Sequence, residues 1–353
     1  MNSRLKSIYR ALASRHLDAL LVSSPANISY LTDATCRDAY FLVCAKKNIY
    51  FTDSRYTEEA RLFLKGNADL CQSNGFIFKQ IIQSALALKV KRLGFEERYL
   101  PFAEFAKLKE YAQDRFGLVP THSIVEDKRQ VKDLGELAKI RQAARITGLA
   151  LNYIRKFIKP GIKEIEIVAE LERFIRYQGA RAAAFDIIVA SGPHSSQPHH
   201  IPGSRKLKDG EPVLIDLGVD YEGYKSDLTR VLFLGKINIL VREVYDIVRK
   251  AQELAIKRIR PGAEMAAIDG VARDYIAEKG YGSCFTHNLG HGFGLEVHEA
   301  PQISQRESSA LRPGMVFTVE PGIYLPGKFG IRIEDMVLIT SKSCEVISGA
   351  WHK

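Results

Sequence analysis

The amino-acid sequence predicts a protein of mixed α/β (α+β) class with two domains, and three observations support this prediction. Strand-like and helix-like segments alternate over residues 1–128. A polar stretch at residues 126–133 has the composition of a linker. Residues 129–353 contain an internal repeat with an offset of about 101 residues, which predicts two related αβ halves around a pseudo-twofold axis.

The composition is that of a globular protein. The chain has 353 residues, of which 46% are hydrophobic and 26% charged, enough for a sizeable core in each of two domains. It has no run of ~18 apolar residues, and its N-terminus lacks the apolar core of a signal peptide. Five cysteines without a C-x-x-C pair indicate neither a disulfide framework nor a zinc finger. We therefore expect a cytoplasmic protein with no membrane partner.

The net charge of +10 raises the alternative of a nucleic-acid-binding protein. Basic residues are, however, interspersed with acidic ones along predicted helices, as in residues 170–176. The densest basic patches, residues 89–92 and 205–208, are short and lack neighbouring aromatic side chains that would stack on bases. This pattern is typical of a solvated surface, and we expect no nucleic-acid partner.

The N-terminal domain is predicted from apolar runs separated by turn residues. Its predicted elements are strands 17–23 and 92–96, a hairpin at 39–53, a helix beginning at Pro25, and helices 56–65 and 102–115. The side chains of these elements do not combine into a catalytic set. We expect a supporting domain.

The C-terminal domain begins with a long amphipathic helix. Apolar residues recur at helical spacing over residues 137–154, with a weak turn at Thr147 and Gly148. A strand at residues 182–190 follows. Four short stretches then carry the repeat: an I-x-P-G sequence opens a helix in each half, and an L-x-x-G sequence places a glycine six residues before an acid in each half. These stretches are 158–161, 259–262, 207–210 and 311–314, and the two helices end near Gly179 and Gly280.

The first acidic pair lies in residues 211–233, which are predicted to form a hairpin. A turn centred between Tyr221 and Glu222 places Asp216 directly opposite Asp227. Two carboxylates among apolar strand residues repel each other and lose their charge unless a cation lies between them. A divalent cation is the simplest remedy.

The second acidic pair repeats the arrangement in residues 315–339. A turn centred on Gly327 places Glu320 beside Glu334, although a bulge at Pro321 would shift this register. The alternative for each hairpin is an exposed edge with ordinary surface acids. Because both hairpins belong to the repeat, we expect four carboxylates around one axis, with two divalent cations balancing their charge.

Two segments concentrate the histidines. Residues 287–299 and 191–200 each contain three, among glycines or prolines that let a small ligand approach closely. These histidines are His287, His291, His298, His194, His199 and His200. Ordinary turns with structural histidines are the alternative. His199 lies about one repeat length before His298, which favours it over its two neighbours as a site residue.

Five motifs, in this order, resemble the pita-bread metallopeptidases, specifically the branch that contains aminopeptidase P and prolidase. They contain Asp216, Asp227, His291 with His298, Glu320, and Arg332 with Glu334. Residues 1–128 look like the creatinase-type domain of this branch, which methionine aminopeptidases lack. The resemblance thus implies a creatinase-type N-terminal domain, 1–128, and a pita-bread catalytic domain, 129–353.

The resemblance implies the metal ligands residue by residue. Asp216 and Asp227 bind one divalent ion. Asp227, His291, Glu320 and Glu334 complete the second, with Asp227 and Glu334 bridging both ions. A donor set of one nitrogen and many carboxylate oxygens suits Mn(II) or Co(II), with zinc and iron as alternatives.

The remaining roles are also implied by resemblance. Glu320 is the acid/base that takes a proton from the attacking water, and His199 and His298 donate hydrogen bonds to the substrate carbonyl. Because Arg332 lies two residues before Glu334 on the same strand face, we expect it to orient a ligating carboxylate, and an ordinary strand-face arginine is the alternative.

These roles imply a metal-dependent hydrolase that releases an N-terminal residue from a following proline, either an Xaa-Pro aminopeptidase or an Xaa-Pro dipeptidase (proline dipeptidase). Members of this branch are commonly homodimers, so we expect a dimer. Two alternatives are a chaperone-like binding protein and a metal-free, creatinase-like hydrolase. The five intact ligand positions argue against both.

Overall fold

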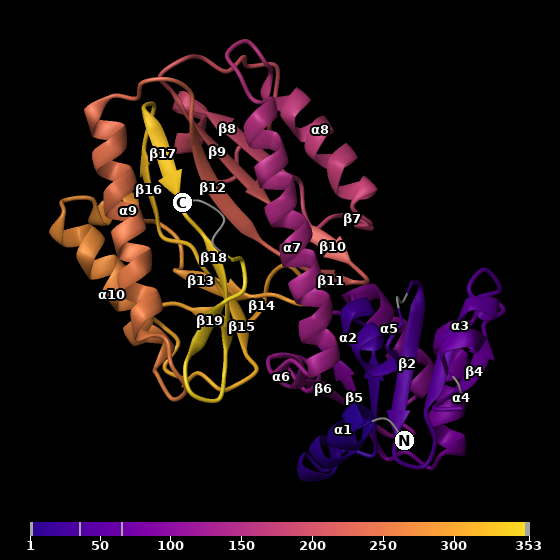
Figure 1. Ribbon diagram of the computed structural model, residues 1–353. Helices are drawn as coiled ribbons and strands as arrows, with labels where there is room; N and C mark the ends of the chain where they lie inside the picture. Colours follow the sequence, from indigo (N-terminus) through magenta and orange to yellow (C-terminus); the bar gives the residue numbers. More distant parts are fainter. Residues whose placement is uncertain (1–2, 35–36, 65, 350–353) are drawn as a thin grey trace. The chain divides into compact units, whose positions relative to one another are not determined.

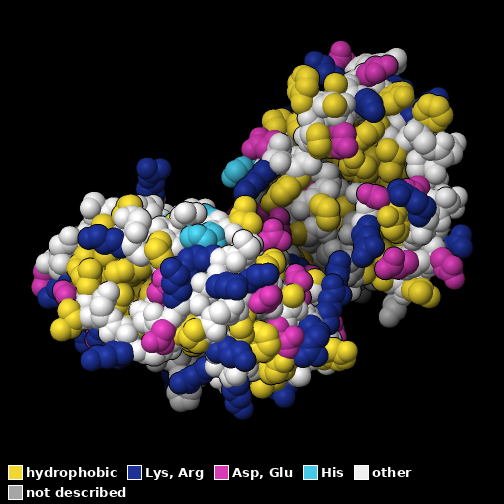
Figure 2. Space-filling view, turned by 90° about the horizontal axis from the view of Figure 1, so that it is seen from above, with side chains coloured by type: hydrophobic (Ala, Val, Ile, Leu, Met, Phe, Trp, Pro, Cys, Tyr) yellow, Lys and Arg dark blue, Asp and Glu magenta, His cyan; other side chains and the backbone are white. Residues whose placement is uncertain are grey.

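The computed structural model describes residues 3–34, 37–64 and 66–349. The chain divides into two compact units, residues 1–129 and 130–353, each with its own apolar core. Within the described ranges, no helix combines the length and apolar character needed to cross a membrane. Lys and Arg side chains are interspersed with Asp and Glu on the face shown in Figure 2.

The N-terminal unit is a six-stranded mixed sheet with helices on both faces (Figure 1). The strand order is β4-β3-β2-β1-β5-β6, and β2 runs antiparallel to both of its neighbours. Leu21 and Leu93 belong to the core that covers one face with α4 and α5, whereas Phe41 lies with Leu5 and Leu31 on the other face. The elements are α1 (Ser3–Ser14), β1 (Ala19–Val22), α2 (Pro25–Thr32), β2 (Ala39–Cys44), β3 (Ile49–Thr52), α3 (Thr57–Leu64), β4 (Asp69–Gln72), α4 (Ile77–Ala87), β5 (Arg92–Glu96), α5 (Phe102–Ala112), β6 (Gly117–Thr121) and α6 (Glu126–Arg129).

The strands and helices predicted for this unit are present, but five elements were not predicted: α1, α4, α6, β4 and β6. The strands β4 and β6 lie at the two edges of the sheet, where most of their residues are exposed or partly exposed. They therefore lack the continuous apolar run from which a buried strand is predicted. The polar stretch at 126–133 is also ordered. Arg129, at the end of α6, is buried and donates to Asn27 Oδ1 at 2.7 Å, and Asp133 caps the next helix by accepting from the Glu136 N–H.

The C-terminal unit consists of two pairs of long helices packed against antiparallel strands (Figure 1). Its helices are α7 (Leu134–Phe157), α8 (Glu164–Tyr177), η1 (Gly192–Ser196), α9 (Ile239–Arg258), α10 (Met265–Glu278) and η2 (Gly282–Cys284). Its strands are β7 (Ala182–Ala183), β8 (Ile188–Ser191), β9 (Pro212–Leu217), β10 (Val219–Tyr221), β11 (Tyr224–Lys225), β12 (Leu228–Phe233), β13 (Gly290–Gly292), β14 (Glu299–Ile303), β15 (Val316–Val319), β16 (Gly322–Leu325), β17 (Phe329–Arg332), β18 (Asp335–Ile339) and β19 (Cys344–Val346).

The predicted internal repeat is confirmed by matching topology and matching hydrogen bonds. The order β12-β9-β8 in one half corresponds to β18-β15-β13 in the other, and α7 with α8 corresponds to α9 with α10. The N–H of Gly161 donates to the carbonyl oxygen of Leu207 at 2.9 Å, and the N–H of Gly262 donates to that of Leu311 at 2.8 Å. Each half therefore places an acid near the end of an equivalent strand, Asp216 on β9 and Glu320 directly after β15.

One detail of the C-terminal prediction is confirmed and another was wrong. The predicted long helix is present as α7 and continues through its weak turn at Thr147 and Gly148, because both are buried on its packed face and the Thr147 hydroxyl bonds Ser226 Oγ at 2.7 Å. Tertiary packing there outweighs weak helix propensity. The strand predicted at 182–190 is two strands, since β7 pairs with β10 whereas β8 pairs with β9.

Replacing Gly290 tests how closely β13 approaches β15. A Cβ atom at Gly290 would overlap the backbone carbonyl of Thr318, whereas one at Gly270, on α10, would meet no atom closer than 4.0 Å. We expect Gly290→Ala to lower the free energy of unfolding by on the order of 1–3 kcal/mol. Gly270→Ala is the control and should leave it unchanged or raise it by up to ~1 kcal/mol. Urea unfolding of both variants measures this, and equal midpoints would contradict the close approach.

Candidate metal centre

The duplicated hairpins bring the four predicted acids to equivalent strand ends. Asp216 is on β9, and Asp227 precedes β12. Glu320 follows β15, and Glu334 precedes β18. His291 is the middle residue of β13, the neighbour of β15. The two halves of the unit therefore contribute to one cluster.

The predicted register of the first hairpin was wrong by two residues. Asp216 pairs with Thr229 rather than with Asp227. The turn consists of Glu222 and Gly223, whose φ values of 48° and 88° are those of a two-residue turn of the kind that favours glycine. Because side chains alternate along a strand, a shift of two residues leaves Asp216 and Asp227 on the same face, as diagonal neighbours.

The predicted register of the second hairpin is confirmed. Val319 pairs with Asp335 on one side of the acids, and Gly322 pairs with Arg332 on the other. Both pairings centre the turn on Gly327, so Glu320 and Glu334 occupy opposite positions. Pro321 introduces no shift of register between the two paired segments.

The side chains of the cluster lie within a few ångströms of one another. His291 Nε2 is 3.2 Å from Glu320 Oε1 and 3.6 Å from Asp227 Oδ2. Single ligand atoms of Asp227, His291 and Glu334 all lie within 4.8 Å of one another. Asp216, Asp227 and Glu334 are buried, and the Glu320 side chain is only 15% exposed. This arrangement concentrates negative charge in a space with little water.

Burial and mutual repulsion shift the pKa values of the acids. Burial, with the charges of Glu334 and Asp216, raises the pKa of Asp227 well above its ordinary value. Burial, with the charges of Glu320 and Asp216, likewise raises the pKa of Glu334. Two of the four carboxyls therefore favour the protonated form when no cation is bound.

Glu320 differs from these two acids because it is paired with His291. Burial by itself would raise the pKa of Glu320, but the hydrogen bond from His291 and its charge lower it. Burial would lower the pKa of His291, but the bond to Glu320 raises it. Glu320 therefore stays ionised more readily than Asp227 and Glu334.

The donor set fits divalent cations. Among the described residues, Asp216 Oδ1 and Glu334 Oε1 are buried and accept no hydrogen bond. Buried carboxylate oxygens without a partner are costly, and a cation ligated by them removes that cost. Carboxylate oxygens with one imidazole nitrogen are ligands for Mn(II), Co(II), zinc or iron.

Arg332 lies inside the cluster. Although Glu334 is only two residues away in the sequence, the acid that Arg332 contacts directly is Asp216. Its Nη2 donates to Asp216 Oδ2 at 2.6 Å, and its Nε donates to Thr229 Oγ1 at 3.0 Å. The Thr229 hydroxyl in turn donates to Glu334 Oε2 at 2.7 Å. One guanidinium group thus positions a carboxylate directly and a second one through a threonine.

His199 and His298 lie at the exposed side of this cluster. Both are exposed, and the ring of His298 is centred 4.3 Å from that of His291. Burial and the charge of His291 lower the pKa of His298, with a smaller contribution from His199. His199 follows Pro198, whose carbonyl oxygen accepts from Arg332 Nη1 at 3.3 Å. Accessible imidazoles at this position are suited to donate hydrogen bonds to a substrate.

The predicted site residues did not include Thr229, Tyr324 and His287. The Tyr324 hydroxyl is 2.9 Å from both Arg332 Nη1 and His287 Nε2, so these groups form a chain beside the acids. Tyr324 lies in the second predicted hairpin, 315–339, and His287 in the histidine-rich segment 287–299. Their contacts, however, join separate segments of the chain, and no local sequence pattern specifies how those segments lie relative to one another.

Comparisons with known proteins identify relatives over the whole chain. Residues 138–341 match metallopeptidase family M24, and residues 4–131 match the creatinase/prolidase N-terminal domain. The chain is 36% identical to an Xaa-Pro dipeptidase of Pyrococcus horikoshii, over 96% of this chain and 95% of the relative. It is 38% identical to an uncharacterized peptidase of Bacillus subtilis, over 98% and 97%.

Two solved structures are similar over nearly their full length. An Xaa-Pro dipeptidase from Bacillus anthracis has a TM-score of 0.94 and 37% identity, covering 98% of this chain and 97% of that one. An X-Pro aminopeptidase from Thermotoga maritima has a TM-score of 0.88 and 38% identity, covering 96% and 97%.

The repulsion among the acids predicts that Asp227→Asn stabilises the metal-free protein at alkaline pH. A carboxyl whose folded pKa is raised stabilises the fold below its unfolded pKa, and that contribution is lost as pH rises through the folded value. The variant avoids this loss, so its gain in unfolding free energy should reach at least about 1 kcal/mol at high pH and shrink on acidification.

Urea unfolding of chelator-treated protein at pH 8 and pH 5 measures the effect. The exposed Asp186 supplies the control, Asp186→Asn, which should stay within about 0.5 kcal/mol of the parent. A variant of Asp227 that is less stable than the parent at pH 8 would contradict the account.

Proposed function

Since the chain belongs to metallopeptidase family M24 and has a creatinase/prolidase N-terminal domain, we propose that it hydrolyses the bond between an N-terminal residue and a following proline. The observation that carries this proposal is the buried cluster of acids with two carboxylate oxygens that lack a partner among the described residues. Relatives named Xaa-Pro dipeptidase and X-Pro aminopeptidase support the choice of bond.

Two divalent ions are proposed to occupy the cluster. Asp216 and Asp227 hold one, and Asp227, His291, Glu320 and Glu334 hold the other, with Asp227 and Glu334 shared. The raised pKa values of Asp227 and Glu334 support the shared positions, because these acids need positive charge most. When bound, such ions supply Lewis-acid activation of a water and of the substrate carbonyl. Mn(II) or Co(II) suits the oxygen-rich donors best.

Glu320 is proposed to accept the proton of the attacking water. Its carboxylate is held ionised by His291 and is partly accessible, which a general base requires. His199 and His298 donate hydrogen bonds to the substrate carbonyl oxygen as negative charge develops on it. Arg332 keeps Asp216 in a fixed orientation through the 2.6 Å ion pair.

The preference for proline follows from the chemistry of the bond. An Xaa-Pro peptide bond is a tertiary amide without an N–H, and the proline ring fixes φ. A protease that grips an extended backbone through its hydrogen bonds handles such a bond poorly. A site that holds the carbonyl by cations and the free α-amino group by acids does not need the missing N–H. Small peptides with proline in second position are therefore the proposed substrates.

The proposal also includes the length of the substrate, the oligomeric state and the cellular location. Both dipeptides and longer Xaa-Pro peptides are candidates, since the relatives are named for each activity. We propose a cytoplasmic homodimer, for which light scattering at micromolar concentration is the direct test of assembly. A monomer at that concentration would remove the dimer and leave the chemistry untouched.

Metal removal should abolish hydrolysis of Ala-Pro, and Mn(II) or Co(II) should restore it. Glu334→Gln, at a shared ligand, should reduce kcat more than His199→Ala, whose loss should cost about 10²–10³-fold. His122→Ala is the matched control, since His122 is an exposed histidine on the N-terminal unit that pairs only with Glu97 among the described acids. Full activity after complete metal removal would eliminate the proposed mechanism.

Specificity is measured by comparing Ala-Pro with Ala-Ala, and Ala-Pro with Ala-Pro-Ala, at saturating metal. We expect Ala-Pro to be cleaved at least about tenfold faster than Ala-Ala, in kcat/KM. The second comparison decides between dipeptidase and aminopeptidase. Equal rates for Ala-Pro and Ala-Ala would refute the proline assignment even if hydrolysis depends on metal.

A further inference from the structure

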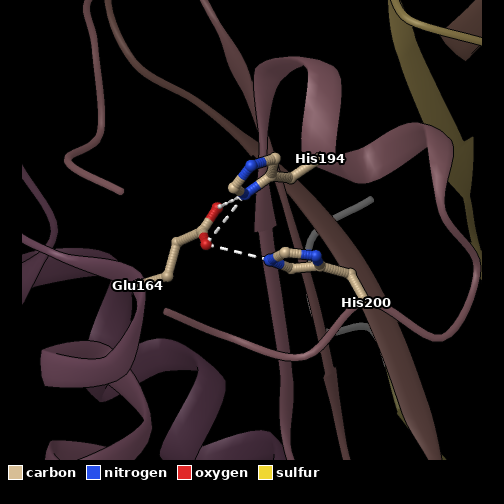
Figure 3. Close-up of side chains that lie close together, drawn as sticks. All are labelled: Glu164, His194 and His200. Atoms are coloured by element: carbon tan, nitrogen blue, oxygen red, sulfur yellow. Dashed lines mark hydrogen bonds and ion pairs between the residues drawn. The ribbon is translucent and has the colours of Figure 1, made fainter. Parts of the chain in front are cut away.

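A second group of ligand-type side chains lies outside the candidate metal centre. Glu164 is the first residue of α8, His194 lies in η1, and His200 lies in the loop that follows η1. Figure 3 shows the Glu164 carboxylate directed at both imidazole rings. None of these three residues is a proposed ligand of the five-residue cluster.

The distances within this group match those between ligands of one metal ion. Glu164 Oε2 is 3.1 Å from His194 Nδ1 and 2.9 Å from His200 Nε2. All three ligand atoms lie within 4.8 Å of one another. Ligand atoms at ~2.0–2.1 Å from a tetrahedral Zn²⁺ are ~3.3 Å apart. Small rotations of the two rings would accommodate an ion.

The carboxylate is held in place by groups on its other side. Glu164 Oε1 accepts from the Ser191 N–H at 2.9 Å and from the Ser191 hydroxyl at 2.7 Å. Oε1 also lies 3.1 Å from His194 Nδ1, and Oε2 contacts both imidazoles. Ligating carboxylates and histidines in metal sites are commonly supported in this way.

The charges around the group also favour a cation. Burial would raise the pKa of Glu164, but hydrogen bonds from His200, Ser191 and His194 lower it, so the carboxylate is ionised. The guanidinium of Arg205 donates to Ser191 Oγ at 2.6 Å, and its own charge is balanced by Glu211 at 2.7 Å. The negative charge of Glu164 is thus available to an ion between the rings.

The three side chains differ in exposure, so the group is enclosed on one side and accessible from the other. The Glu164 side chain is 0% exposed and that of His200 is 9% exposed, whereas that of His194 is 36% exposed. An ion can reach the site past His194. Which ring nitrogen of an imidazole donates and which one can bind an ion depends on the tautomer, so the nitrogens that face Glu164 can also serve as ligand atoms.

We propose that Glu164, His194 and His200 form a separate binding site for a transition-metal ion such as Zn²⁺. Two imidazoles and one carboxylate are a zinc ligand set that leaves one coordination position for water. The site adds to the proposed peptidase function and does not depend on it. Because His194 and His200 flank residues 195–199, a bound ion holds both ends of the loop that carries His199.

The test is Zn²⁺ binding to the full chain carrying Asp227→Asn and Glu334→Gln, which weakens binding at the candidate metal centre. Isothermal titration after chelator treatment, with metal content by mass spectrometry, should show one Zn²⁺ per chain. Adding His194→Asn or His200→Asn should weaken this binding at least about tenfold. The partly exposed His194 is the safer change, and circular dichroism confirms folding of each variant.

The exposed pair of His122 and Glu97, 3.1 Å apart, supplies the matched control. His122→Asn in the same background should leave Zn²⁺ affinity unchanged, because two exposed groups do not enclose an ion. Zn²⁺ should also raise the melting temperature of the background protein, and His194→Asn should remove this rise. Absence of Zn²⁺ binding, or binding equally tight in both histidine variants, would show that the three residues form hydrogen bonds only.

Discussion

Repulsion among carboxylates is the constraint on which the C-terminal unit depends. Three of the four acids are buried and the fourth is nearly so, and the side chains that bond to them include Arg332, His291, Thr229 and Thr318. Arg332 neutralises one charge and His291 a second, which leaves Asp227 and Glu334 with raised pKa values. Cations at these positions convert a destabilising cluster into a stable one, so the same feature that weakens the metal-free fold creates affinity for metal.

The duplicated architecture explains how such a cluster is built. Each half supplies a hairpin whose acids lie at equivalent strand ends, and the helices α7 to α10 cover the strands with two separate apolar cores. Close backbone contacts fix the geometry, because Gly290 and Gly292 on β13 have no room for a side chain. The acids are therefore held by packed strands rather than by mobile loops, which suits a site that must keep its ligands at fixed separations.

The two hairpins show how far sequence reasoning reaches. The second register was predicted correctly, because Gly327 lies in an evident turn between two apolar strands. The first was wrong by two residues, because the turn places Glu222 as well as Gly223 at positive φ, a conformation that glutamate rarely adopts. The period of two along a strand still kept both acids on one face. The bond from Arg332 to Asp216 and the grouping of Glu164 with His194 and His200 link distant segments, and no local pattern specifies them.

Diffraction from crystals soaked in Mn²⁺, recorded near the manganese absorption edge, tests the central claim most directly. If two ions occupy the cluster, two anomalous peaks ~3.5–4 Å apart are expected. Both should lie within bonding distance of side chains from the set Asp216, Asp227, His291, Glu320 and Glu334. Asp227 and Glu334 should each contact both ions. A single peak, or none among these five side chains, would contradict the proposed dinuclear centre.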